Sequence, residues 1–300
     1  MADKKIPPEK VFTREELQKA VNRQRRIMFL VSPASRKPKK VFGKELFWDT
    51  SAGKVRVLFN NYDCDEVRPV HFNIHGGGFN TSFPEVDDKY MQMFSDKLGI
   101  KVINIDYTLA PEAQFPVAMN QCKAVVEYAK AHAEELKIDT ERMSIGGYSA
   151  GGNLSAAVIL SDPERTLGIK GCIIAYAPMD IYTDPYLKPS PKGCIPPQAA
   201  RIADPCYFQD KEGRKNPLIS PAFSTVDFVK GFPPTYVATA SQDSLCQEGE
   251  KFKDTLIAAG VDVTFKRYEG EKHGFTHYKG AAADECWEEQ TAFLKRVLTD

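Results

Sequence analysis

The sequence predicts an α/β fold, in which a mostly parallel central sheet is flanked by helices on both faces. Strand-like apolar runs alternate along the chain with longer segments in which apolar residues recur at helical spacing. Such an alternation is typical of parallel strands that are joined by helical crossovers. The sequence contains no internal repeat and no low-complexity tract that would favour another architecture.

The expected strands and helices follow one another in a regular order. The strand-like runs cover residues 55–59, 67–75, 101–107, 143–147, 171–177, 234–240 and 261–268. The helical patterns cover residues 117–137, the segment that begins at Ala150, and residues 248–259 and 284–298. Length alone would allow one or two domains, and we expect a single domain over residues 1–300.

Two segments do not fit the alternation. Residues 13–30 form an amphipathic helical pattern that opens with a capping box, Thr13-Arg-Glu-Glu16. Residues 180–215 are rich in Pro, Tyr and Cys and have little periodicity. The first could be a helix packed on the core and the second a long surface loop, although a loop of this length in a compact domain is more often functional.

The composition is that of an ordinary globular protein. Lysine plus arginine and aspartate plus glutamate number 40 each, so the net charge gives no indication of binding to nucleic acid or to an anionic membrane. The N-terminus has no apolar signal-peptide core, and no segment approaches the length of a membrane span. The seven cysteines lack CxxC spacing, which favours reduced thiols over disulfides or a zinc site. We therefore expect a cytoplasmic protein.

The most informative motif is Gly147-Tyr-Ser149-Ala-Gly151, a G-x-S-x-G pentapeptide between a strand-like run and a helical pattern. This context predicts a nucleophile elbow, a strained turn that exposes the serine hydroxyl. The two glycines allow the strand and the helix to approach each other closely. The alternative is an ordinary loop rich in Gly and Ser, and three further segments weigh against it.

Each of these segments supplies a group that a serine nucleophile needs. The glycines of His75-Gly-Gly-Gly78 follow a strand-like run and let backbone N–H groups point at a developing oxyanion. Asp243 follows the penultimate run and can orient an imidazole, while His273 follows the last run in the position of a general base. The chain order Ser149, Asp243, His273 is that of α/β-hydrolases.

Together these motifs resemble those of the hormone-sensitive-lipase-like family of carboxylesterases, from about residue 40 to the C-terminus. The resemblance is carried by HGGGF (75–79), DYTLAPEAQFP (106–116), GYSAGGNL (147–154), NPLISP (216–221), Asp243 and HGF (273–275). It implies an α/β-hydrolase fold with Ser149 as the nucleophile, His273 as the base and Asp243 as the acid that orients it. The oxyanion donors that it implies are Gly77, Gly78 and Ala150. In this family, segments such as those at about 1–40 and 180–215 form a cap over the active site.

Two positions depart from the family pattern. The family usually has Asp where this chain has Tyr148, and commonly Pro where it has Ser244. Neither position belongs to the triad. We expect the Tyr148 side chain to project away from Ser149 towards the loops or the cap beside the cleft, where it would bind substrate. Phe79 is the second residue expected to bind substrate. Further aromatic candidates for the pocket walls are Phe83, Tyr186, Tyr207 and Phe208, although core or cap packing would explain each of them equally well.

Other acids and histidines could challenge these assignments. Asp180 and Glu248 also lie near strand ends, but neither is as close to the end of the penultimate strand as Asp243. His273 and His277 have the spacing of two metal ligands on a helix, but Gly274 follows the first of them and no H-E-x-x-H glutamate is present. We therefore expect no metal, and place His277 at the cleft rim or on the surface.

The remaining histidines have simpler interpretations. His71 lies in an apolar strand and is expected to be a hydrogen-bonded core residue, while His132 lies in a polar helix and is expected to be solvated. The resemblance implies that His75 helps to hold the glycine loop.

The sequence therefore predicts a serine carboxylic ester hydrolase that needs no cofactor and forms an acyl-enzyme intermediate. The further expectation of small, short-acyl esters rests on the resemblance. The same groups could serve a deacetylase or an amide or formamide hydrolase, and the fold also serves non-catalytic ligand receptors. All three triad residues are present, which argues against a receptor. The expected partner is a small-molecule ester, with no nucleic acid and no membrane, and the sequence is compatible with a homodimer.

Overall fold

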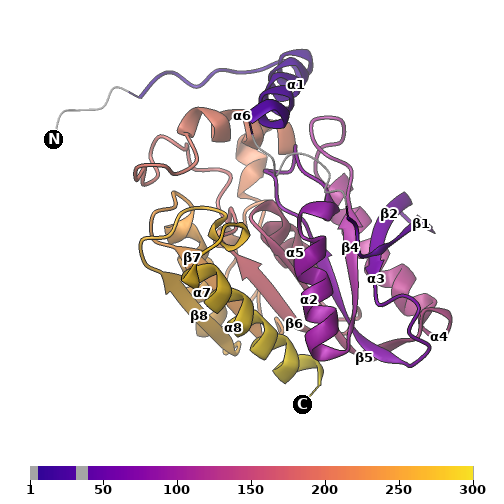
Figure 1. Ribbon diagram of the computed structural model, residues 1–300. Helices are drawn as coiled ribbons and strands as arrows, with labels where there is room; N and C mark the ends of the chain where they lie inside the picture. The colour runs from indigo at the N-terminus through magenta and orange to yellow at the C-terminus, as the bar shows by residue number, and fades with distance from the viewer. Residues whose placement is uncertain (1–5, 32–39, 300) are drawn as a thin grey trace.

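An eight-stranded sheet forms the centre of the computed structural model, which describes residues 6–31 and 40–299 (Figure 1). The strand order is β1-β2-β4-β3-β5-β6-β7-β8. Strand β2 pairs antiparallel with β1 and β4, and all the other pairs are parallel. The strands are β1 (Lys44–Thr50), β2 (Gly53–Asn60), β3 (Arg68–Ile74), β4 (Lys101–Asp106), β5 (Ile138–Tyr148), β6 (Ile169–Ala175), β7 (Thr235–Ala240) and β8 (Val263–Tyr268). The predicted α/β class and the mostly parallel sheet are confirmed.

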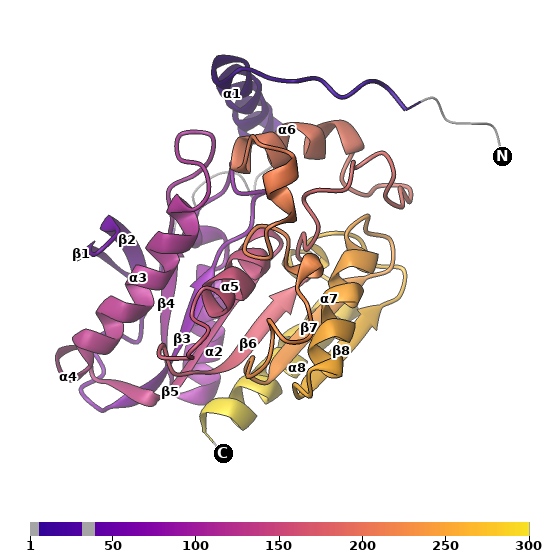
Figure 2. The same cartoon turned by 180° about the vertical axis from the view of Figure 1, so that it is seen from behind.

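Helices cover both faces of this sheet (Figures 1 and 2). The α-helices among the described residues are α1 (Arg14–Val31), α2 (Asp88–Leu98), α3 (Val117–Ala131), α4 (Ala133–Leu136), α5 (Ala150–Leu160), α6 (Pro197–Tyr207), α7 (Cys246–Ala258) and α8 (Ala281–Leu298). Short 3-10 helices are η2 (Pro84–Val86), η3 (Glu212–Lys215), η4 (Pro221–Phe223) and η5 (Phe275–His277). None of the helices in these ranges combines the length and the apolar character that crossing a bilayer requires.

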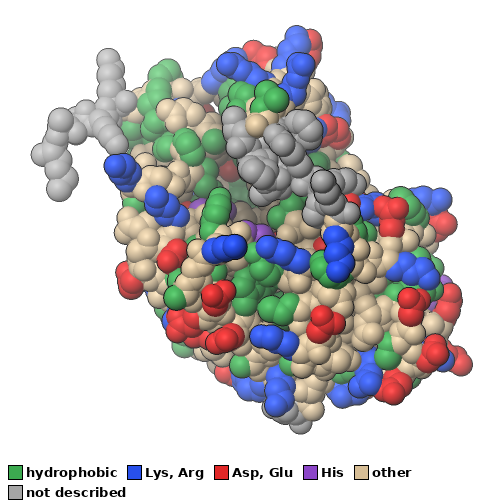
Figure 3. All heavy atoms as spheres, viewed as in Figure 1, with side chains coloured by type: hydrophobic (Ala, Val, Ile, Leu, Met, Phe, Trp, Pro, Cys, Tyr) green, Lys and Arg blue, Asp and Glu red, His purple; other side chains and the backbone are tan. Residues whose placement is uncertain are grey.

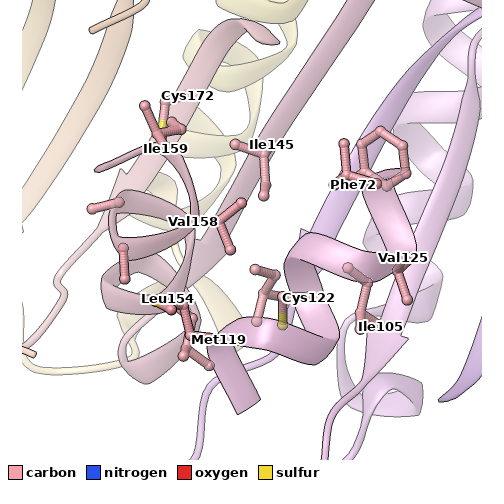
Figure 4. Packing of buried hydrophobic residues seen from close by; sticks show 14 of the residues in the cluster. Phe72, Ile105, Met119, Cys122, Val125, Ile145, Leu154, Val158, Ile159 and Cys172 are labelled. Atoms are coloured by element: carbon pink, nitrogen blue, oxygen red, sulfur yellow. The ribbon is translucent and has the colours of Figure 1, made fainter. Parts of the chain in front are cut away.

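Two hydrophobic clusters lie on opposite faces of the sheet. Helices α3, α5 and α7 bury their apolar side chains in the larger cluster, part of which Figure 4 shows around Ile145 and Leu154. Helices α2 and α8 pack on the other face in the second cluster. Successive residues of a strand point to opposite faces. Met143 and Ile145 of β5 therefore lie in the first cluster, and Tyr148 lies in the second.

The two segments that did not fit the predicted alternation lie together at one end of the sheet, where α1 and α6 are neighbours (Figures 1 and 2). The predicted helix at 13–30 is confirmed as α1, and its capping box is formed: Thr13 Oγ1 accepts from the N–H of Glu16 at 3.2 Å. The 180–215 segment is more ordered than a surface loop, since α6 occupies residues 197–207. Of the cap predicted at 1–40, residues 1–5 and 32–39 lie outside the described residues.

Candidate active site

Ser149 lies at the sharp junction between β5 and α5. Its φ of 53° is unusual for a residue with a side chain. The turn is fixed because its N–H donates to the carbonyl of Ala175 at 2.9 Å. A Cβ atom on Gly147 or Gly151 would lie only 2.4 or 1.8 Å from the carbonyl oxygen of Ile74. Only glycine allows the end of β3, the end of β5 and the start of α5 to meet in this way.

Ser149, His273 and Asp243 form a continuous chain of hydrogen bonds. Nε2 of His273 lies 2.9 Å from Oγ of Ser149, and Nδ1 of His273 lies 2.7 Å from Oδ2 of Asp243. The Asp243 side chain is fully buried and also accepts the N–H of Leu245 at 3.1 Å. With the carboxylate as its partner, Nδ1 carries the ring proton, so Nε2 is free to accept the serine proton. Both distances are those of ordinary hydrogen bonds.

The parallel sheet explains why these three residues meet. Ser149 directly follows β5, Asp243 lies just beyond β7, and His273 lies in the loop after β8. The carboxyl ends of parallel strands share one edge of a sheet, which is where α/β proteins bind ligands. The loops after β7 and β8 are joined by a hydrogen bond from the N–H of Gln242 to the carbonyl of Glu271 at 2.8 Å.

The glycine loop after β3 lies beside Ser149. Gly77 and Gly78 have φ angles of 111° and 58°. The carbonyl of Gly77 accepts hydrogen bonds from the N–H groups of Asn80 and Thr81, at 3.2 and 2.9 Å, which closes the turn on its carbonyl side. Within the described residues, the N–H groups of Gly77, Gly78 and Ala150 donate no hydrogen bond, so they are available to a ligand.

His75 is hydrogen-bonded to the glycine loop that it precedes. Its Nδ1 donates to the carbonyl of Gly76 at 2.7 Å, and its ring stacks on Tyr107 with the centroids 4.3 Å apart. The side chain is buried, and burial lowers the pKa of the imidazole. A neutral ring that donates through Nδ1 agrees with the supporting role that the resemblance implied.

The alternative acids do not face His273. The carboxylate of Glu248 accepts the N–H groups of Met179 and Asp180, at 2.8 and 3.2 Å, and pairs with Lys188 at 2.6 Å. Asp180 instead accepts the N–H groups of the following turn. Burial raises the pKa of Glu248 to about 7. Of the three acids weighed from the sequence, only Asp243 contacts the imidazole.

The other histidines have partners of their own. Nε2 of His277 lies 2.7 Å from Oδ1 of Asp87, so His277 and His273 do not share a ligand position. His71 is buried beside Oγ of Ser144 at 2.9 Å, as predicted, and burial lowers its pKa to about 3. His132 is half-buried rather than solvated, because its ring stacks on Tyr128. Among residues 6–31 and 40–299, no group of three or more His, Cys, Asp or Glu side chains is arranged to hold a metal ion.

A cavity of about 880 Å³ opens at Ser149 and His273. Gln24 and Arg25 of α1 line it, together with one face of α6 and residues of the 176–188 segment. Both segments predicted to form a cap thus border the cavity. Figure 3 shows histidine side chains reaching the surface below α1, in the middle of this face.

Some of the aromatic candidates line the cavity, and others pack behind the residues that line it. Phe79 and Phe83 line the cavity. Tyr207 does not, but its ring stacks behind Phe79 with the centroids 3.8 Å apart. Tyr176 was missed in the sequence analysis, although it directly follows β6. It lines the cavity, and its ring meets that of His273 edge to face at 5.2 Å.

The sequence predicted that Tyr148 would reach the loops or the cap beside the cleft, and the side chain borders the cavity but lies mainly against α8 and not against the cap. Its side chain is buried against α8, and its hydroxyl donates to Oε1 of Gln290 at 2.7 Å. Its ring meets those of Trp287 and His277. The reason is the alternation along β5, which directs residue 148 to the face that α2 and α8 cover.

The chain is similar to known proteins in sequence and in fold. It matches, over residues 71–277, the model of a family described by the alpha/beta hydrolase fold. It is 27% identical over 214 residues to an acetyl esterase of Salmonella schwarzengrund, a match covering 70% of this chain and 66% of that protein. It is 30% identical over 215 residues to an arylesterase of Saccharolobus solfataricus, a match covering 69% of this chain and 67% of that protein.

Among solved structures, carboxyl esterase 2 of the mycorrhizal fungus Tuber melanosporum is similar, with a TM-score of 0.80 and 27% identity. The similarity covers 89% of this chain and 90% of that chain, and so includes segments outside the family match.

Proposed function

We propose, from the premise that this chain belongs to the α/β-hydrolase fold family and to its hormone-sensitive-lipase-like branch, that it is a serine carboxylic ester hydrolase. The observation that carries the proposal is the hydrogen-bonded chain Ser149–His273–Asp243, which opens into a cavity beside three N–H groups without a partner in the described residues. This set of groups is sufficient for acyl transfer.

In the proposed acylation step, Oγ of Ser149 attacks the ester carbonyl carbon while Nε2 of His273 takes the hydroxyl proton. Asp243 stays ionised and stabilises the imidazolium. When the tetrahedral intermediate collapses, the bond from carbon to the alcohol oxygen breaks, and the proton on Nε2 passes to the departing alcohol. The products of this step are a free alcohol and an acyl group on Ser149.

Deacylation repeats the same proton transfers with water. His273 takes a proton from the water as its oxygen attacks the acyl carbon, and then returns that proton to Oγ of Ser149 as the acid leaves. Both steps pass through an oxyanion, which the N–H groups of Gly77, Gly78 and Ala150 would bind. Ala150 is the first residue of α5, so the positive end of the helix dipole adds to the attraction. Each donor of this kind is worth about 3 kcal/mol in transition-state binding.

We further propose that the substrates are small esters with short acyl chains. The support is a largely apolar cavity between the catalytic loops and the cap segments, together with similarity to an acetyl esterase and an arylesterase. Phe79 would form part of the acyl or alcohol wall, and Tyr148 would contribute the edge that it exposes to the cavity. A cytoplasmic location is also proposed, because all seven cysteines are free thiols.

The experiment that tests the proposal combines turnover with labelling. Initial rates on p-nitrophenyl esters from acetate to dodecanoate should show hydrolysis with an optimum at short chains. A fluorophosphonate should label one serine, and peptide mass spectrometry should identify it as Ser149. Absence of ester turnover in folded protein, or labelling at another residue, would overturn the proposal.

A further inference from the structure

One face of α1 binds a single residue of the loop that follows β4. Nη2 of Arg14 donates to the carbonyl of Glu112 at 3.2 Å, and Nε2 of Gln18 donates to its carboxylate at 2.9 Å. Arg25 forms a two-point ion pair with that carboxylate, with N–O distances of 2.5 and 2.9 Å. Positions 14, 18 and 25 lie on one helical stripe, so α1 can make all three contacts without bending.

Two apolar residues on the same stripe strengthen the docking of α1. Leu17 and Val21 are fully buried and form a small cluster with Ala110 and Cys206. Ala110 belongs to the loop that carries Glu112, and Cys206 belongs to α6. The helix is therefore fixed to the body and to the other cap segment at once.

Arg25 reaches further than the other two polar residues of this face. Its Nε donates to the carbonyl of Asn80 at 2.7 Å, and its Nη2 donates to the carbonyl of Ala110 at 3.1 Å. Asn80 belongs to the glycine turn, because its N–H donates to the carbonyl of Gly77. One guanidinium group thus joins α1, the loop of Glu112 and the loop that carries the proposed oxyanion donors.

The hydrogen bonds of Arg25 favour a rigid attachment of α1. A guanidinium group presents its donors in a fixed plane, and here they meet one carboxylate and two carbonyl oxygens. The hydrogen bond from Arg25 is the main cause that lowers the pKa of Glu112 to about 2. The carboxylate is therefore ionised throughout the range in which an unprotonated histidine can act as a base.

We propose that Arg25 is a positioning residue for the oxyanion loop, through which the docking of the N-terminal helix controls the rate of acyl transfer. The inference rests on the proposed ester hydrolysis. Oxyanion donors stabilise the transition state only when they lie close to hydrogen-bond distance from the developing charge. Without the contact to the Asn80 carbonyl, the turn that holds Gly77 and Gly78 loses its anchor on the cap side.

The test uses Arg25→Met in the full chain, with Gln18→Ala as the matched control. Gln18 lies on the same helix and contacts the same glutamate, but it has no contact with Asn80. On p-nitrophenyl acetate, Arg25→Met should lower kcat by about 10-fold with KM within about 2-fold, because the loss is specific to the transition state. Gln18→Ala should leave both constants within about 2-fold, since one exposed contact contributes little.

Inhibitor affinity separates positioning from a purely structural role. A trifluoromethyl ketone is attacked by Ser149 and forms an oxyanion, whereas the matched methyl ketone serves as a ground-state competitor. Arg25→Met should weaken the trifluoromethyl ketone by about the same factor as kcat and leave the methyl ketone unchanged. Glu112→Gln should have a smaller effect on both kcat and the trifluoromethyl ketone, because Arg25 can still reach Asn80.

The outcomes distinguish this inference from the proposed function. If wild-type protein hydrolyses esters and Arg25→Met, shown to be folded by circular dichroism, keeps both its kcat and its affinity for the trifluoromethyl ketone, the positioning role is wrong. Equal losses for the two ketones would also overturn it, since they would indicate a damaged cavity. If Arg25→Met fails to fold, Arg25→Lys takes its place, and a loss of trifluoromethyl ketone affinity alone is then the supporting result. Absence of turnover in the wild type would instead refute the proposed function.

Discussion

The Ser149 hydroxyl faces the cavity, and the backbone of this residue is held by hydrogen bonds to other backbone groups. Its strained φ is fixed by backbone contacts of β6 and α5, namely the Ala175 carbonyl and the N–H groups of Gly152 and Asn153. The hydroxyl itself makes only the hydrogen bond to His273 in the described structure. Chemistry and stability are therefore separable at this residue.

This separation gives the first prediction. Ser149→Ala should lower kcat on p-nitrophenyl acetate by roughly 10⁴-fold, because only binding and the oxyanion donors remain. The melting temperature should stay close to that of the wild type, since no core cavity is created. Steady-state kinetics and a thermal melt check both parts. A folded variant that keeps a tenth of the wild-type kcat would show that Ser149 is not the nucleophile.

Tyr148 presents the opposite case, since its hydroxyl serves the core. Tyr148→Phe leaves Oε1 of the fully buried Gln290 without its donor. We expect a loss of about 1–3 kcal/mol in the free energy of unfolding, with kcat within a few-fold of wild type. Urea denaturation and ester kinetics measure the two quantities.

A matched double variant checks the cause. Tyr148→Phe combined with Gln290→Met removes both polar partners and should recover most of the lost stability, because no buried acceptor is left unsatisfied. If Tyr148→Phe leaves stability unchanged but alters KM on a bulky ester more than on a short one, the hydroxyl acts on substrate and this interpretation is wrong.

Helix α6 bounds part of the cavity. Its inward face carries small residues, Ala199, Ala200 and Ala203. A Cβ atom on Gly78 would lie 3.9 Å from the Cβ of Ala203, so this face lies over the oxyanion loop. Small side chains at these positions leave room for a substrate between cap and catalytic loops.

A larger side chain on the inward face of α6 should change which acyl-chain lengths the protein hydrolyses. Ala203→Phe is expected to lower kcat/KM on p-nitrophenyl octanoate by about 10-fold or more, with the acetate within about 3-fold, because a longer acyl chain needs the lost volume. Gln198→Phe is the control, since Gln198 is exposed on the same helix and does not line the cavity. Equal losses on both esters for Ala203→Phe would refute a role of α6 in acyl length.

The observed strands and helices also show which elements a sequence pattern can predict. Central strands are continuous apolar runs because both their faces are buried, so β3, β4, β6 and β7 were predicted close to their observed bounds. Strand β5 begins at Ile138, before its predicted start at residue 143, because residues 139–142 are polar and half-buried or exposed. Edge strand β1 was missed because most of its residues are exposed, and only Trp48 is buried. Helix α6 was missed because it contains Pro197 and Pro205, and its inward face borders a cavity rather than a core.

The triad could be predicted because each member lies at the end of a strand or in the loop that follows it. The direction of Tyr148 could have been predicted as well, by counting alternate residues from Met143 along β5. The contacts of Arg25 with Asn80 and of His277 with Asp87 could not. They join segments that are far apart in the chain, and no local pattern encodes which segments meet.

For the molecule as a whole, two buried histidines contribute to how stability responds to acid. His71 lies in β3 at the centre of the sheet, is 1% exposed, and has its pKa lowered by burial from 6.5 to about 3. His75, at the end of the same strand, is also buried, and its pKa is lowered for the same reason. Both rings are therefore neutral in the folded protein at pH values where an unfolded chain would bind protons.

The sign of the effect follows from this difference. Between pH 6.5 and about 3 the unfolded chain carries a proton on His71 and the folded protein does not. The contribution of His71 to stability is therefore complete above pH 6.5 and is lost as the pH falls towards 3. Each such proton costs about 1.4 kcal/mol of unfolding free energy per pH unit.

Replacing His71 tests this account. In the double variant His71→Leu, Ser144→Ala, both partners of the buried hydrogen bond become apolar, so no unsatisfied group remains. Its unfolding free energy, measured by urea denaturation, should fall less steeply with acid than that of the wild type, by about 1.4 kcal/mol per pH unit between roughly pH 6 and 4. Ser144→Ala alone retains the imidazole and should keep the wild-type slope. Parallel curves for the double variant and the wild type would mean that His71 takes up its proton without unfolding, and that the centre of the sheet admits charge more readily than its burial indicates.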